Sequence, residues 1–141
     1  NTNGFPVDPV LREKVEKAAI KVVKADYGKG YKFKDFQKTM GAGYDLQFTD
    51  KETSEVWCIE VKGTAGSREA FFITRSEVRV GRAILEEERE GGSRRWRLAL
   101  VTNALDPAKR ELVYFDAEQL EVRFELQCLQ WQAFPKSEIE E

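Results

Sequence analysis

The chain has 141 residues, a formal net charge of −2 and a pI near 5.5, which suits a single domain over 1–141 with a sizeable core. It has no histidine, and its two cysteines, Cys58 and Cys128, lack metal-binding spacing, which disfavours zinc and histidine acid–base chemistry. No apolar run approaches the roughly 18 residues of a membrane span, and two reduced cysteines suit a cytoplasmic protein. Because the first residue is Asn, we expect the domain to be excised from a longer protein.

A first helix is predicted to begin at Asp8 and to end near Tyr27. Asp8 is a good N-cap, and the proline that follows it is favoured at the first helical position. Valines and alanines at helical spacing give this helix an apolar stripe. Lysines recur on the remaining surface, and Lys17 and Lys21 are candidates for phosphate contact, although a solvated helix face is the simpler interpretation.

Aromatic and basic residues alternate from Tyr31 to Met40, which favours a strand. Phe33 and Phe36 cannot share a face of that strand unless it ends or bulges between them. Nucleic-acid bases can stack on such rings, with Lys32 and Lys34 as candidate phosphate ligands. An ordinary amphipathic strand remains the simpler interpretation of the same pattern.

Two further strands are predicted over residues 44–48 and 56–62, joined by a polar segment that indicates an antiparallel hairpin. In the second strand, Glu60 and Lys62 share one face because strand side chains alternate. We expect Phe48 to pair with Cys58 or Val56, which brings Asp45 level with Glu60 to within about one residue pair. Two carboxylates and a lysine therefore converge at the end of a buried strand, an arrangement that is costly for folding and typical of a metal site.

This pattern resembles the signature of PD-(D/E)xK nucleases, with Asp45 followed by Glu60-Val61-Lys62. More narrowly, four stretches between about Val15 and Phe115 resemble the NO VEIN C-terminal domain, which also occurs in bacterial restriction and helicase-linked proteins. In chain order, these stretches are Gly43-Tyr44-Asp45, Ile59-Glu60-Val61-Lys62-Gly63-Thr64, Ile73-Thr74-Arg75-Ser76-Glu77-Val78 and Leu100-Val101-Thr102-Asn103.

The resemblance implies an α/β fold with an αβββαβ restriction-endonuclease-like core, in which a mixed sheet is flanked by helices. It also implies a metal-dependent endonuclease that hydrolyses DNA in restriction or defence. Asp45, Glu60 and the Val61 carbonyl supply oxygen ligands suited to Mg²⁺ or its substitute Mn²⁺, and Lys62 is the catalytic cation. Glu16, on the first helix, is a candidate accessory residue because some nucleases of this type place an acid there, although pairing with a lysine is the simpler interpretation.

A second helix is predicted after a flexible loop that follows Gly63, because Thr74 and Glu77 form a capping-box pattern. That pattern explains both residues structurally, and they are otherwise candidate accessory residues of the site. Arg75, between them, is a candidate phosphate ligand at the start of the helix. We expect the helix to end at Gly91-Gly92.

Two more strands are predicted over 96–101 and 112–115, with a turn near Pro107 between them. From Leu120 onward, Val122, Phe124, Leu126 and Cys128 alternate at strand spacing, which predicts a C-terminal β extension. Trp131 and Phe134 follow, and the chain closes with an acidic segment.

Two other function classes remain open. One is an inactive nuclease-like module that binds DNA, and the other is an interaction module that couples a helicase or ATPase to a partner. Residues 1–40 carry nine basic and five acidic side chains, whereas residues 116–141 carry two and seven. We therefore expect weak DNA binding by this domain, with targeting by another domain or subunit, such as a helicase or a modified-base reader. A homodimer is possible, since related nucleases often cut two strands as dimers.

Overall fold

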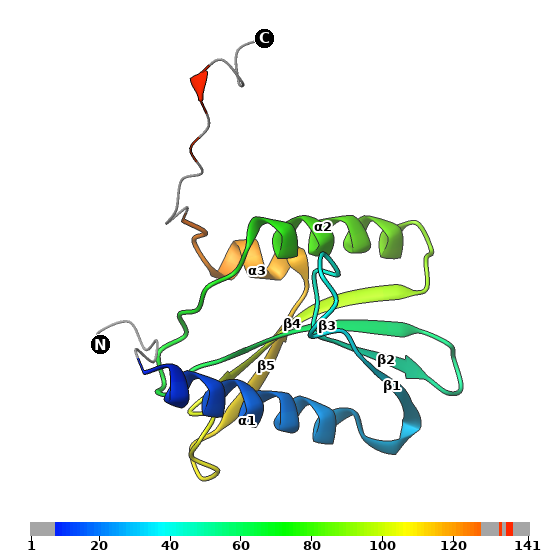
Figure 1. Ribbon diagram of the computed structural model, residues 1–141. Helices are drawn as coiled ribbons and strands as arrows, with labels where there is room; N and C mark the ends of the chain where they lie inside the picture. The colour runs from blue at the N-terminus through cyan, green and yellow to red at the C-terminus, as the bar shows by residue number, and fades with distance from the viewer. Residues whose placement is uncertain (1–7, 128–132, 134, 137–141) are drawn as a thin grey trace.

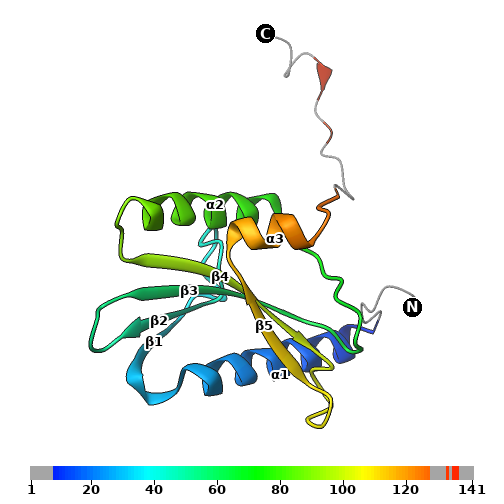
Figure 2. The ribbon, with the colours of Figure 1, turned by 180° about the vertical axis from the view of Figure 1, so that it is seen from behind.

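A computed structural model describes residues 8–127, 133, 135 and 136. These residues form a three-layer α/β structure, with α1 on one face of a mixed sheet and α2 and α3 on the other (Figures 1 and 2). The elements in chain order are α1 (Pro9–Tyr27), a 3₁₀ turn η1 (Gly28–Gly30), β1 (Tyr31–Asp35), β2 (Leu46–Asp50), β3 (Val56–Gly63), α2 (Arg75–Arg89), β4 (Arg94–Thr102), β5 (Glu111–Phe115) and α3 (Ala117–Arg123). The predicted α/β class and the αβββαβ order are confirmed.

The sheet has the order β1-β2-β3-β4-β5, with β3 and β4 parallel and the other neighbours antiparallel. The predicted hairpin of β2 and β3 is present, but its register was wrong by one residue, since Phe48 pairs with Trp57. The last pair of this ladder joins Leu46 to Ile59. Asp45 and Glu60 are the next residues along the two strands, so they lie at the same level, as predicted.

Helix α1 begins and ends as its sequence predicts. The Asp8 carboxylate accepts a hydrogen bond from the Val10 N–H, and Pro9 occupies the first turn. Val15, Ala19 and Val23 are buried in a core that also contains side chains of β2, β3 and β4. This packing fixes α1 across the sheet, with its lysines on the side away from the strands.

Strand β1 ends at Asp35, five residues before the predicted end at Met40. The Asp35 carboxylate accepts from the Gln37 N–H at 2.8 Å, and the Phe36 N–H donates to the Asp45 carbonyl at 2.7 Å. The second bond continues the pairing with β2 by one residue, and the first begins a turn at Asp35 that takes the chain away from the ladder. The strand therefore ends between Phe33 and Phe36, as their spacing required.

Helix α2 carries the predicted capping box, in which Thr74 accepts from the Glu77 N–H and the Glu77 carboxylate accepts from the Thr74 N–H. The second core packs α2 and α3 against the sheet, around Trp96 and Ile84. Both helices thus cover the sheet face opposite α1, and α2 begins near the end of β3.

The predicted C-terminal β extension was wrong over the described part, where residues 117–123 form helix α3. Asp116 caps this helix together with Gln119, and Ala117 and Leu120 turn inward one helical turn apart. Local capping thus prevails over the alternating pattern, and Val122 is 83% exposed. The remainder of the predicted extension, including Cys128, Trp131 and Phe134, lies outside the described residues.

Candidate functional site

Asp45 lies where β2 and β3 begin to separate. Its N–H donates to the Ile59 carbonyl at 2.9 Å, and its carboxylate Oδ2 accepts from the Val61 N–H at 2.8 Å. A side-chain oxygen thereby replaces the next backbone acceptor of the ladder. This bond holds the Asp45 carboxylate beside the C-terminal part of β3, as the predicted convergence requires.

Glu60, Lys62 and Glu77 form a partly buried ion-pair cluster. Lys62 Nζ lies 3.1 Å from Glu60 Oε2 and 3.2 Å from Glu77 Oε1. The Glu60 side chain is only 4% exposed, compared with 17% for Lys62 and 20% for Glu77. The capping box orients the Glu77 carboxylate, so one glutamate both caps α2 and holds the lysine.

The cluster has more negative than positive groups. With Asp45 included, three carboxylates surround one ammonium, so two negative charges are in excess when all four groups are ionised. Burial raises the pKa of Glu60 to about 9, and it also raises the pKa of Asp45. Burial by itself would lower the pKa of Lys62, but the charges of Glu60 and Glu77 outweigh that effect and raise it. Lys62 is therefore cationic at neutral pH, and Glu60 retains a proton until a cation offsets its charge.

The oxygen atoms at this edge have the chemistry that a hard divalent cation requires. A strand residue directs its N–H and C=O to the same side, so the Val61 carbonyl faces the side on which the Asp45 carboxylate lies. Carboxylate and carbonyl oxygens are the ligands that Mg²⁺ and Mn²⁺ prefer. Over residues 8–127, no group of three or more acidic, cysteine or histidine side chains is preformed to hold an ion, and Lys62 holds two of these carboxylates instead. The donor set fits a divalent cation that keeps several waters.

Gly43 and Trp96, which are far apart in the sequence, hold this site in position. Gly43 has φ +79°, and a Cβ atom there would lie 2.5 Å from the Val80 side chain. The Trp96 indole N–H donates to the Gly43 carbonyl at 3.0 Å. Together they fix the turn that leads into Asp45. No local sequence pattern links Trp96 to Gly43, so this contact could not be predicted from the sequence.

The other predicted accessory residues surround the cluster at different distances. Glu16 on α1 is near enough for its charge to contribute to the raised pKa of Asp45, after burial and the charge of Glu77. Gly63 allows α1 to pack this close to β3, since a Cβ atom at Gly63 would lie 3.0 Å from the Ala19 side chain. Thr74 is the N-cap of α2. Arg75 is exposed on the first turn of α2 and forms no ion pair with another described residue.

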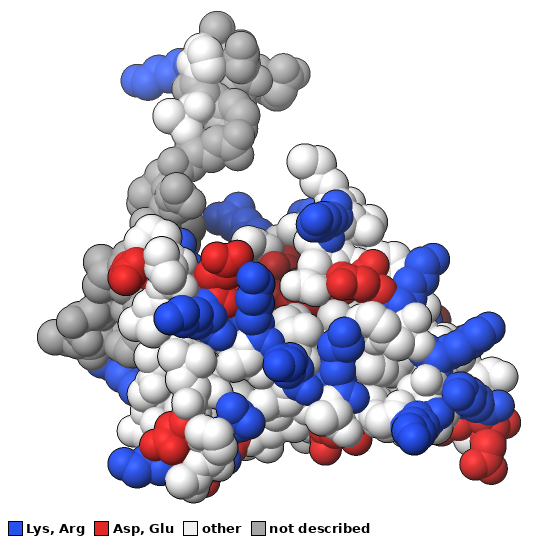
Figure 3. Space-filling view, turned by 60° about the horizontal axis from the view of Figure 1, so that its bottom comes forward, with Lys and Arg blue, Asp and Glu red and all other residues white. Residues whose placement is uncertain are grey.

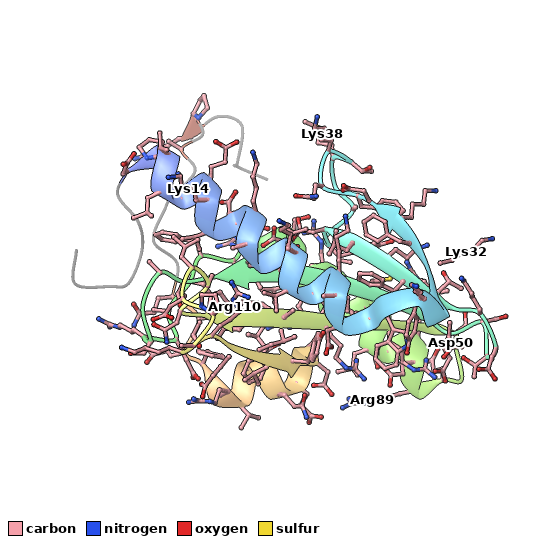
Figure 4. All side chains as sticks on the ribbon, turned by 90° about the horizontal axis from the view of Figure 1, so that it is seen from below. Lys14, Lys32, Lys38, Asp50, Arg89 and Arg110 are labelled. Atoms are coloured by element: carbon pink, nitrogen blue, oxygen red, sulfur yellow. The ribbon has the colours of Figure 1, made fainter. Side chains whose placement is uncertain are left out.

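The predicted phosphate ligands lie on the outer surface and not within the cluster. Lys17 pairs with Glu13 at 3.4 Å, and both side chains are largely exposed. Lys21 is exposed on α1, and Lys32 and Lys34 are exposed on the edge strand β1. Figure 3 shows Lys and Arg side chains spread across the α1 face, with Asp and Glu side chains scattered among them and around the edges of the view. Figure 4 places Lys14 on α1, Lys38 beyond β1 and Lys32 at the opposite end of that strand.

Comparison with protein families assigns most of the chain to a known family. The model of the family described as Protein NO VEIN, C-terminal matches residues 15–115. The chain belongs to this family. The matched region runs from α1 to β5 and contains every residue of the Lys62 cluster. No curated protein and no solved structure matches the chain.

The NO VEIN C-terminal match ends before α3, and this helix packs beside α2 in the second core. The family assignment thus covers the sheet, α1 and α2. None of the helices in the described residues has the length and apolar character that a bilayer crossing requires.

Proposed function

We propose that this domain is a divalent-metal-dependent nuclease that hydrolyses DNA phosphodiester bonds. The observation that carries the proposal is the pairing of a buried Glu60 with Lys62 beside the Asp45 carboxylate, at the end of a central strand. A structural ion pair needs one carboxylate for one lysine, whereas this cluster has an excess of acid. Such an excess is stabilised by a cation, and a protonated lysine next to it suits an anionic substrate.

The chain's residues have separate roles in this proposal. Asp45, Glu60 and the Val61 carbonyl would hold Mg²⁺, or Mn²⁺ in its place. The bound ion would supply Lewis-acid chemistry, lowering the pKa of water and neutralising charge on the scissile phosphate. The Val61 N–H keeps Asp45 in place, and Glu77 orients Lys62.

Lys62 is the catalytic cation of the proposal. Its raised pKa keeps it protonated, so it can donate hydrogen bonds to a phosphate oxygen or to the attacking water as charge develops. Arg75, exposed at the start of α2, would contact a neighbouring phosphate. DNA approaching this edge would also meet the lysines of the α1 face, which provide weak, salt-sensitive contacts.

We also propose that other domains or subunits, such as a helicase, an ATPase or a modified-base reader, direct this activity in restriction or defence. The domain's net charge of −2 favours this arrangement, because it provides no strong general attraction to DNA.

The experiment is an incubation of the domain with supercoiled plasmid, linear duplex and single-stranded DNA in Mg²⁺, Mn²⁺ or EDTA. We expect cleavage of at least one substrate with either metal, none in EDTA, and none by Glu60→Gln. Glu111→Gln, an exposed change on β5, is the matched control and should cleave normally. Binding to DNA in Ca²⁺ with no cleavage in any metal would instead identify an inactive binding module.

A further inference from the structure

A second concave site lies at the other end of β3, on the α1 face of the sheet. It is a pocket of about 300 Å³, open to solvent and lined by Asp26, Tyr27, Tyr31, Trp57, Arg97 and Tyr114. None of these residues belongs to the Lys62 cluster. Trp57 and Lys62 are five residues apart on one strand, which separates the two sites by about 17 Å along β3.

The pocket's aromatic rings are held in place by packing. Tyr27 is stacked on Phe48 with ring centroids 4.2 Å apart and planes within 4°. Tyr31 and Tyr114 meet Tyr27 edge-on, at 5.0 Å and 6.0 Å. Phe48 is only 2% exposed, so the stack is anchored in the core. The walls are thus preorganised for a flat ligand, with little ordering cost on binding.

Two side chains of opposite charge, Arg97 and Asp26, line this pocket, and each has atoms available for further hydrogen bonds. The Arg97 guanidinium lies over the Trp57 ring at 5.1 Å, and its hydrogen bonds to the Trp96 carbonyl and Glu88 both use Nη1. Asp26 Oδ2 accepts from the Tyr114 hydroxyl at 2.6 Å. Among residues 8–127, Arg97 Nε and Nη2 and Asp26 Oδ1 have no protein hydrogen-bond partner, so they are available to a ligand.

These features favour a planar ligand that both donates and accepts hydrogen bonds. A quaternary ammonium ligand is disfavoured, because Arg97 already covers Trp57 and repels a second cation. A purely apolar ligand would leave Arg97 Nε and Nη2 and Asp26 Oδ1 without partners. The volume is at the small end of ligand pockets and accommodates one ring system of nucleobase size.

We propose that this pocket binds one unstacked nucleobase, guanine in preference to the other bases. Guanine presents O6 and N7 as acceptors to Arg97 and an amino group as a donor to Asp26, while its ring stacks among the aromatic walls. A base inside a duplex cannot reach such a pocket, so the base must be flipped out or single-stranded.

The pocket's surroundings suit the backbone of such a strand. Lys24 in the last turn of α1, Lys29 in η1 and Lys32 on β1 are all exposed near it, and Figure 4 shows Lys32 at this end of the sheet. The choice of nucleic acid as the source of the base rests on the proposed function, but the binding itself requires neither metal nor cleavage.

The test is a titration of the isotope-labelled domain with GMP, AMP, CMP and ribose 5-phosphate in EDTA, followed by the tryptophan indole N–H resonances in NMR. We expect GMP to shift the Trp57 resonance saturably, with the tightest affinity of the four compounds. The Trp96 resonance is the internal control, because this indole is buried and bonded to Gly43. No saturable Trp57 shift, or equal shifts with ribose 5-phosphate, would overturn the proposal.

Variants can distinguish stacking on the ring of the base from hydrogen bonding to its edge. Tyr31→Leu should weaken binding of every base by about tenfold. Asp26→Asn, an isosteric change at an exposed position, should reduce the preference for GMP over AMP by about fivefold or more, whereas Asp35→Asn at the far end of β1 should not. An unchanged preference in Asp26→Asn would contradict the assignment to guanine.

The Lys62→Ala domain distinguishes a failure of this proposal from a failure of the nuclease proposal. We expect it to bind GMP as the unaltered domain does, since Lys62 does not line the pocket. GMP binding without cleavage by the unaltered domain would refute the nuclease only. Cleavage without GMP binding would refute the pocket only.

Discussion

A cationic side chain lies at each end of β3, but the two cations have very different surroundings. At the N-terminal end, Arg97 rests on the face of Trp57, and the aromatic packing around it is favourable for folding. At the C-terminal end, Lys62 lies between two carboxylates with a third nearby, in a site where burial penalises every charge. The first end needs no ligand to be stable, whereas the second carries an excess of acid that a proton on Glu60 or a bound cation would offset.

The largest effect that separates the two ends is expected in DNA cleavage. Asp45→Asn, Glu60→Gln and Lys62→Ala should each lower the cleavage rate by about 10³-fold or more, since each removes a metal ligand or the catalytic cation. Tyr31→Leu, at the other end of the sheet, should leave the rate on a saturating plasmid substrate within about tenfold. Single-turnover cleavage rates measure both, and similar losses at the two ends would remove the distinction between them.

Gly43→Ala should damage the Lys62 end through the backbone. Its positive φ and the 2.5 Å approach of Val80 leave no room for a methyl group, so we expect a loss of about 3 kcal/mol in unfolding free energy. Urea denaturation measures this loss. Val80→Ala in the same chain should restore part of it, and GMP binding at the distant pocket should survive wherever the domain is folded. A fully stable Gly43→Ala domain would contradict the turn described here.

Much of the Lys62 end was predictable because its determinants are local. Strand alternation placed Glu60 and Lys62 on one face, the short hairpin brought Asp45 level with them, and the capping pattern located Glu77 at the start of α2. The contact between Glu77 and Lys62 was not predictable. It depends on how α2 packs on the sheet, which no pattern within either segment encodes.

The aromatic end was missed because its residues come from α1, β1, β3, β4 and β5. Each of Tyr27, Trp57 and Tyr114 has an ordinary packing explanation in its own element, and only the assembled sheet brings them together. The helix α3 was missed for a different reason. Its short sequence also alternates like a strand, and the cap at Asp116 decides between the two structures.

The pH dependence of stability should also distinguish the two ends. Folding raises the pKa of Glu60 from 4.5 to about 9, so the folded state holds a proton that the unfolded state loses as pH rises above 4.5. Stability is therefore highest below that pH and falls as pH rises toward 9. Relative to Glu60→Gln, the domain should lose about 4 kcal/mol between pH 5 and 8. Parallel stability curves for the two proteins, measured by urea denaturation, would show that Glu60 does not retain its proton.

The smallest effect is expected on the outer face of α1. Lys21→Gln should weaken duplex DNA binding in Ca²⁺ about equally for all sequences and should reduce the salt slope by about 1. Fluorescence anisotropy over a salt series measures both quantities, with Lys109→Gln, exposed near β5, as the control. A sequence-dependent loss would indicate base recognition by Lys21 and not a phosphate contact.

The central claim, that the acidic excess at Lys62 is a cation site, is tested most directly by calorimetric titration with Mn²⁺ at pH 7 in buffers of different ionisation enthalpy. We predict binding to the unaltered domain with release of about one proton, since the ion displaces the proton that Glu60 retains. Asp45→Asn and Glu60→Gln should bind Mn²⁺ at least about tenfold more weakly, whereas Lys62→Ala should bind it as well as the unaltered domain or better. Equal affinity in the unaltered domain, Asp45→Asn and Glu60→Gln, or no binding in any of them, would contradict the account.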